Sequence, residues 1–301
     1  MGWKSLIGAI FILAVAVLLG VYWFVPFQQI EFGVSGNTNF SVDGFEDSMQ
    51  FYPDMRFPSS DIPYRIDGCP LQKQDDMERG FAILGNETGL NFYPVSGGEE
   101  ISVGCDSNVR IENGMFIAGE GGPTNITQTG KFNVILSGRI MLLKDSECEK
   151  PNVAIHELLH VLGFKHSENP NNIMYNYSKC GQTIGDDIIN LLKDLYAVPS
   201  EPDLAFESVN ASVHGRYLDA EMNVRNVGLQ KAGGSKISIY ADGKLVEEID
   251  LDELGIGYGR KINLKNVGIM QISVSELDFE IEYDYEELNK ENNNIKMEIN
   301  N

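Results

Sequence analysis

Hydrophobic and polar residues alternate with two different periods along this chain. Apolar residues recur at helical spacing over 188–195, just after two aspartates suited to the start of a helix, and they predict a helix there. The apolar, β-branched run 134–143 predicts a strand. Over 209–249 the period falls to two, which predicts consecutive strands. A region of helices and strands is therefore followed by a region of strands alone.

The strand-rich region begins after a proline-marked linker at 198–202. Its predicted strands cover 209–213, 218–224, 236–240 and 245–249. The last two are joined by Ala241-Asp242-Gly243-Lys244, a sequence typical of a tight hairpin turn. These strands predict a small antiparallel β-sandwich over residues 198–301.

An uncharged run at 6–25 is long enough to cross a bilayer as a helix. Lys4 precedes it and no lysine or arginine follows until Arg56, so the positive-inside rule places the N-terminus in the cytoplasm and the rest outside. A cleaved signal peptide, and hence a secreted protein, is the alternative. The bulky end of the run lacks a small-residue cleavage site, which favours a retained single-pass anchor over 1–26.

Three of the four histidines lie between positions 156 and 166. Positions i and i+4 share one face of a helix, so His156 and His160 can bind one ion, with Glu157 beside them. Gly163 can adopt a backbone conformation closed to residues with a Cβ, which lets the helix end and His166 reach the same metal. Three protein ligands leave a fourth position for water, as in catalytic zinc sites.

A methionine further along the chain strengthens this interpretation. The short motif alone could be a helix that carries two histidines by chance. The downstream Ile173-Met174-Tyr175 adds the methionine turn of the extended zincin signature. With it, the sequence resembles the metzincin metalloproteases and, within them, the matrixins. The resemblance implies that Met174 forms a hydrophobic floor under the ligands; an ordinary core methionine is the alternative.

The resemblance to matrixins covers about residues 56–197. Residues 62–66 resemble the first strand of such a domain, 75–85 its first helix, and 185–196 its closing helix. The implied fold is α+β, with a mixed sheet and an active-site helix. The polar stretch 27–55 before it is interpreted as a stalk, although its Phe40, Phe45 and Phe51 could still pack on the protease.

Two features depart from animal matrixins. Those proteins hold a second, structural zinc through histidines upstream of the catalytic helix, whereas this chain has no histidine before His156. We therefore expect one zinc. Their propeptide cysteine also caps the catalytic zinc, but the first cysteine here, Cys69, lies inside the protease-like region. A cysteine switch therefore has no support in this sequence.

Four cysteines, an even count in an exported domain, predict two disulfides. Three connectivities are open. We favour Cys69 with Cys105 and Cys148 with Cys180, because the second pair would bracket the zinc helix and the methionine turn. Four buried free thiols are the alternative.

The C-terminal region resembles another family at 202–204, 224–228 and 291–294. These segments are similar to the immunoglobulin-like CARDB domains of prokaryotic surface proteins. The resemblance implies that this region could bind a cell-surface ligand. Its acidic segment 280–291 could be interpreted as a calcium loop, but a solvated charged face is the simpler account and calcium has no support here.

The formal net charge of -21 argues against nucleic acid or anionic lipid as a partner, because an acidic surface repels both. The sequence predicts a membrane-anchored, outward-facing zinc endopeptidase that acts on protein or peptide, with Glu157 as general base. The alternative is a surface adhesion or scaffold protein with vestigial or minor protease activity, and the intact Glu157 favours the enzyme. A third hypothesis is a zinc hydrolase that acts on substrates other than peptides. Only the wide cleft typical of the matrixin family argues against it.

Overall fold

The computed structural model describes residues 38–41, 48–108, 110–112, 115–145, 148–271 and 273–299, together with residues 2, 3, 13 and 15. The chain divides into two units, Met1–Ser35 and Gly36–Asn301. The anchor predicted over 1–26 falls almost entirely outside the described residues. Among the residues that are described, no helix has the length and apolar character needed to cross a membrane.

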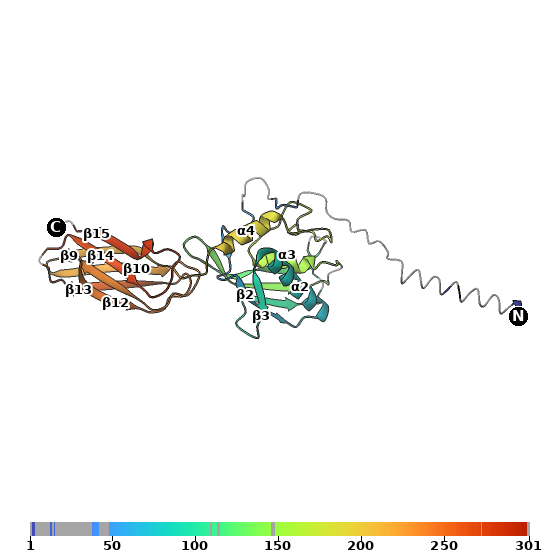
Figure 1. Cartoon of the computed structure of the whole chain (residues 1–301), viewed down its shortest axis with the longest axis horizontal. Coiled ribbons are helices and arrows are strands. Elements are labelled where there is room, and N and C mark those ends of the chain that lie inside the picture. Colours follow the sequence, from blue (N-terminus) through green and yellow to red (C-terminus); the bar gives the residue numbers. More distant parts are fainter. Residues whose placement is uncertain are drawn as a thin grey trace. The chain divides into compact units, whose positions relative to one another are not determined.

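A mixed sheet forms the base of the domain that carries the histidines (Figure 1). Its strands are hydrogen-bonded in the order β1-β8-β4-β2-β3, and these pairs are all parallel. Strand β7 pairs antiparallel with β8 along the whole length of β8, from 133 to 142. The mixed sheet predicted from the sequence is therefore confirmed. The strands are β1 (Met55–Arg56), β2 (Asp61–Asp67), β3 (Asn91–Pro94), β4 (Ile101–Cys105), β7 (Gly119–Gln128) and β8 (Asn133–Leu142).

Three helices accompany this sheet: α2 (Leu71–Thr88), α3 (Asn152–Val161) and α4 (Asp186–Ala197). Helix α2 buries Met77, Phe81 and Leu84 at helical spacing. It ends at Gly89, whose φ of 83° lies in the left-handed region that favours glycine. Helix α3 is buried along most of its length, as its mostly apolar sequence requires. The helices expected at 75–85 and 185–196 are thus present.

Two disulfides cross-link this domain with the predicted pairing. Cys69 bonds Cys105, which joins the segment before α2 to the end of β4. Cys148 bonds Cys180, so the segment before α3 is tied to the loop beyond the methionine turn. Two disulfides indicate an extracytoplasmic location, because the cytosol keeps thiols reduced.

Within the predicted stalk 27–55, the described residues pack on the domain that carries the histidines instead of standing apart from it. Phe40 and Met49 contact its core, and Met55 is completely buried within that core. The backbone N–H of Phe40 also donates to Asp187 on α4, at 2.6 Å. Phe45 lies outside the described residues. The sequence left this packing open, and no periodic pattern in so short a segment could have predicted it.

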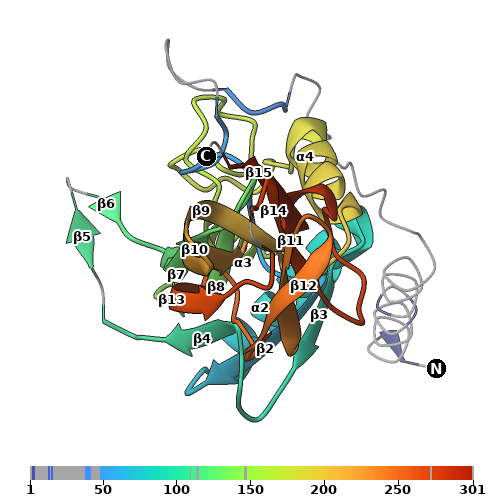
Figure 2. The ribbon, with the colours of Figure 1, turned by 90° about the vertical axis from the view of Figure 1, so that its left-hand side faces the viewer.

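The C-terminal domain is a β-sandwich, as predicted (Figure 2). One sheet has the order β13-β10-β9 and the other β12-β11-β14-β15, with their apolar faces forming a common core. Asp242 and Gly243 both have positive φ, the conformation of a tight hairpin turn. The strands are β9 (Leu204–His214), β10 (Tyr217–Asn226), β11 (Ser235–Ala241), β12 (Lys244–Leu251), β13 (Gly259–Gly268), β14 (Glu276–Glu282) and β15 (Asn294–Glu298), which follows the short helix η1 (Glu291–Asn293).

A short hairpin of β5 (Ile111–Glu112) and β6 (Met115–Phe116) lies between β4 and β7 in the chain. Figure 2 shows it projecting from the side of the molecule. Lys73 on α2 holds the chain just after β4 and just after β8. Its buried ammonium donates to the carbonyls of Asp106 and Leu143, at 3.0 and 2.9 Å.

Candidate metal centre

Helix α3 presents two of the three predicted ligands on one face. The rings of His156 and His160 lie 4.6 Å apart between centroids, one helical turn from each other. His160 is buried and His156 is partly buried. Both imidazoles are therefore held by a helix that is itself anchored in the core.

The third predicted ligand reaches the same point from a turn. Gly163 has a φ of 93°, the left-handed conformation that ends the helix. Beyond it the chain brings His166 back, and Nε2 of His166 lies 3.1 Å from Nε2 of His160. One nitrogen from each of His156, His160 and His166 lies within 4.8 Å of the others. The structure thus brings together all three residues that the sequence singled out.

The hydrogen bonds of the rings show that the donor set suits zinc. Nδ1 of His156 donates to the carbonyl of Ile173 at 2.7 Å, and Nδ1 of His160 donates to the carbonyl of Phe164 at 2.8 Å. The proton is assigned to Nδ1 because a carbonyl can only accept, and this leaves the Nε2 lone pairs facing one another. Three imidazole nitrogens are the donors of many catalytic zinc sites, and here the rings of His156 and His160 have the backbone partners that such ligands usually have behind them.

Burial also keeps these imidazoles neutral. Loss of solvation lowers the pKa of His156 to about 4 and that of His160 to about 3, and it lowers the pKa of His166 as well. Neighbouring histidines add to the lowering at His160. A neutral imidazole is the form that binds a metal, so little protonation competes with metal binding at ordinary pH.

The methionine turn connects the first and third ligands through the backbone. The Ile173 carbonyl holds His156, and the N–H of Ser167, next to His166, donates to the carbonyl of Met174 at 2.9 Å. The buried side chain of Asn172 closes the turn by accepting from the N–H of Met174, at 2.8 Å. Met174 is completely buried in the core of this domain, and its role as the floor of the site stays a prediction.

Glu157 lies beneath strand β7. Its side chain is 6% exposed, and burial together with the charge of Glu120 raises its pKa to about 8. A Cβ on Gly119 would come within 2.7 Å of the Glu157 carboxylate, and one on Gly121 within 2.3 Å of the Glu157 carbonyl. These glycines allow the strand to cross directly over the helix. The sequence reasoning missed them, although glycines at 119, 121 and 122 within a strand are a recognisable signal of close backbone approach.

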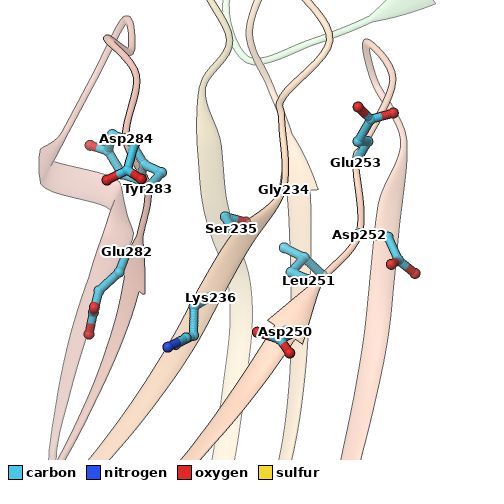
Figure 3. Close-up of a pocket in the computed structure, with 10 residues that line it drawn as sticks. All are labelled: Gly234, Ser235, Lys236, Asp250, Leu251, Asp252, Glu253, Glu282, Tyr283 and Asp284. Atoms are coloured by element: carbon cyan, nitrogen blue, oxygen red, sulfur yellow. The ribbon is translucent and has the colours of Figure 1, made fainter.

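The C-terminal domain has a hollow of its own, with a volume of about 840 Å³ (Figure 3). Five carboxylates line it: Asp250, Asp252, Glu253, Glu282 and Asp284. Basic residues pair with two of them, Arg260 with Asp252 at 3.0 Å and Lys231 with Glu253. No histidine lines this hollow, so it is separate from the metal centre. Its charge favours cationic groups over phosphates.

Comparison with known families assigns both domains. The matrixin family model matches residues 70–197, and the CARDB model matches residues 201–301. No curated protein matches the chain. Residues 70–197 are therefore a matrixin metalloprotease domain, with His156, His160 and His166 as its zinc-binding triad, and a CARDB domain follows it.

Solved structures similar to parts of the chain include the following three. The CARDB domain of a Pyrococcus furiosus protein is 17% identical, with 33% of this chain and 87% of that chain covered and a TM-score of 0.29. Archaemetzincin from Methanopyrus kandleri is 12% identical, with 46% and 97% covered and a TM-score of 0.32. High choriolytic enzyme 1, a hatching enzyme zinc-protease from the medaka fish Oryzias latipes, is 20% identical, with 36% and 46% covered and a TM-score of 0.22.

Proposed function

We propose that this protein is a membrane-anchored extracytoplasmic zinc endopeptidase in which Glu157 is the general base. The supporting observation is the placement of the Glu157 carboxylate. It is buried one residue from His156, on the helix that presents two ligands, and under a strand whose glycines leave room for it. A scaffold with a vestigial site would have no need of a buried carboxylate at this position, because burying an unpaired acid costs free energy.

The chemistry divides between the metal and this side chain. Zinc, when bound, supplies a Lewis acid that polarises the scissile carbonyl and acidifies a water molecule. Glu157 accepts a proton from the attacking water on its carboxylate and delivers it to the leaving amine. Burial raises the pKa of this carboxyl above that of an exposed glutamate, and the positive charge of a bound zinc ion would favour the ionised form that accepts the proton.

Strand β7 supports peptide as the substrate. In the described part of the chain β7 pairs with β8 alone, so its second edge offers unpaired backbone groups beside Glu157. An extended peptide can add to such an edge as a further strand, with its backbone held next to the metal ligands. A small non-peptide substrate would leave most of this edge unused. The edge therefore favours an endopeptidase over a zinc hydrolase of other substrates.

The proposed location rests on two independent features. The disulfides require an oxidising compartment for the catalytic domain. The uncharged run 6–25, which precedes it, would cross the membrane with the N-terminus in the cytoplasm and would anchor the domain on the outer side. A protease-protection assay on intact cells would place residues beyond Arg56 outside, and their protection inside the cell would contradict the proposal.

Binding of a cell-surface ligand by the CARDB domain stays a prediction. Its acidic hollow would attract a positively charged ligand, which fits a role in bringing substrate or surface to the protease. In the alternative function, adhesion would be the main activity and proteolysis minor.

Incubation with a diverse peptide library distinguishes these functions. The full-length chain, loaded with zinc, should cleave internal peptide bonds that mass spectrometry can identify. A zinc chelator should abolish the cleavage, and added zinc should restore it. Absence of cleavage by fully zinc-loaded protein would instead favour the adhesion role.

A further inference from the structure

The turn that carries the third ligand is paired with a segment more than one hundred residues earlier in the chain. Gln50 and Phe164 form an antiparallel bridge. The N–H of Phe51 donates to the carbonyl of Gly163 at 2.8 Å, and the N–H of Lys165 donates to the carbonyl of Met49 at 2.9 Å. The segment Met49-Gln50-Phe51 therefore acts as a short strand for this turn.

The side chain of Gln50 adds a second layer of bonds. It is 2% exposed, and its amide nitrogen donates to the carbonyls of Leu162 and Met55, at 3.1 and 2.8 Å. Its amide oxygen accepts from the N–H of Met55 at 3.0 Å. One amide thus joins the end of the ligand helix to Met55, whose side chain lies where a Cβ on Gly163 would be.

The hydrogen bonds of the segment Met49-Gln50-Phe51 lie next to the backbone groups that orient the metal ligands. Phe164, opposite Gln50, provides the carbonyl that holds Nδ1 of His160. The ring of Phe51 stacks against the ring of His160 with centroids 6.2 Å apart. His166 lies at the end of the turn. A shift of the turn would therefore move the His160 partner and the His166 backbone together.

We propose that Gln50 is a positioning residue of the zinc site: its amide fixes the turn over 162–166 and so sets how tightly His160 and His166 bind the metal. This proposal rests on the zinc triad but not on peptide cleavage. It extends the functional site to a segment that precedes the matrixin match, which begins at residue 70. Partners behind metal-binding histidines commonly change metal affinity by about 10- to 100-fold when they are removed.

The test is the zinc affinity of Gln50→Met in the full-length chain. Methionine keeps the length of the side chain but cannot make the amide hydrogen bonds. Competition with a chromophoric chelator should show zinc binding weakened by about 10-fold or more. The cobalt-loaded variant should have an altered visible absorption spectrum, which reports ligand geometry. Gln74→Met is the matched control, because Gln74 lies on α2 and donates to Glu78 of the same helix; its zinc affinity should equal that of the parent.

A purely structural role predicts a different result. The melting temperature of metal-free Gln50→Met would fall while its zinc dissociation constant stayed at the parental value, and this outcome would overturn the proposal. If the variant does not fold, hydrogen exchange in the parent decides. Zinc removal should speed exchange at the amides of Phe51 and Lys165 relative to those of β10, since coupling between two sites is reciprocal. Unchanged exchange there would also overturn it. Failure of the zinc-loaded parent to cleave peptides would contradict the proposed function alone.

Discussion

The two parts of the metal centre are stabilised in different ways. His156 and His160 lie on α3, where helical geometry fixes their spacing and the buried face of the helix fixes their direction. His166 lies on a turn whose shape depends on the distant segment 49–55 and on the methionine turn at 172–175. The helical part is determined locally, whereas the turn is determined by tertiary contacts.

Because of this difference, substitutions on the helix and substitutions around the turn should have different effects. Changes on the helix should affect chemistry or a ligand directly, because the backbone there is held by its own hydrogen bonds. Changes around the turn should act on zinc affinity through position, even where the substituted residue is far from any ligand. The predictions that follow test this separation, from the largest expected effect to the smallest.

Glu157→Gln should lower kcat/KM for peptide cleavage by about 10²- to 10⁴-fold, the usual contribution of general acid–base catalysis. Zinc content should not change, because Glu157 is outside the ligand set. Steady-state kinetics and metal analysis of the same preparation measure both. Glu87→Gln, at an exposed position of α2, is the control. Parental turnover in the Glu157 variant would remove the proposed base.

Removal of the Cys148–Cys180 disulfide by serine substitution should lower the free energy of unfolding by about 3 to 4 kcal/mol in the chain-entropy model. The sequence separation of this pair is 32, close to the 36 of Cys69–Cys105. Replacement of Cys69 and Cys105 by serine therefore controls for the effect of chain entropy. Urea unfolding should show similar losses for both, but zinc release should accelerate more when Cys148 and Cys180 are replaced. Equal zinc release would show that this disulfide has no particular role at the metal centre.

Gly163→Ala should lower the free energy of unfolding by about 1 to 3 kcal/mol and weaken zinc binding. The added Cβ would lie 2.8 Å from Sδ of Met55, and the backbone has a φ of 93°. Gly89→Ala is a matched control, since Gly89 also has positive φ but has no neighbour within 4 Å of an added Cβ. We expect it to cost about 1 kcal/mol and to leave zinc affinity unchanged. A Gly163 variant that binds zinc normally would contradict the role given to the turn.

Glu100→Gln should stabilise the protein at alkaline pH without changing zinc affinity. Burial raises the pKa of Glu100 to about 7, and one of its carboxylate oxygens has no hydrogen-bond partner. The folded state therefore holds a proton that the unfolded chain loses above pH 4.5, so the parent loses stability as pH rises from about 4.5 to about 7. After allowance for partial exposure, we expect the substitution to gain about 1 to 2 kcal/mol at pH 8 and almost nothing at pH 4. Unfolding at the two pH values measures it, and an equal gain at both would exclude ionisation as the cause.

The sequence predicted well those features that depend on local pattern. Spacing of i and i+4 identified His156 and His160, and alternation with a period of two identified the strands of the CARDB domain. His166 was predicted correctly because Gly163 marks the end of the helix and the methionine turn follows. Each of these signals lies within a short stretch of chain.

Contacts between distant segments could not be predicted in this way. Nothing near Gln50 indicates that it pairs with Phe164, because a buried glutamine and an exposed one look alike in a sequence. The approach of β7 to Glu157 likewise requires a tertiary contact between Gly121 and α3. The residues that support the turn were missed for the same physical reason that makes the turn sensitive to distant substitutions.

Zinc stoichiometry in the parent and in two ligand variants tests the central claim most directly. After dialysis against zinc-free buffer, metal analysis of the full-length chain should give one zinc per parental chain. His160→Ala, on the helix, and His166→Ala, on the turn, should both lose it, because two imidazoles bind zinc far more weakly than three. Retention of one zinc per chain by His166→Ala would contradict the account, since the turn would then carry no ligand.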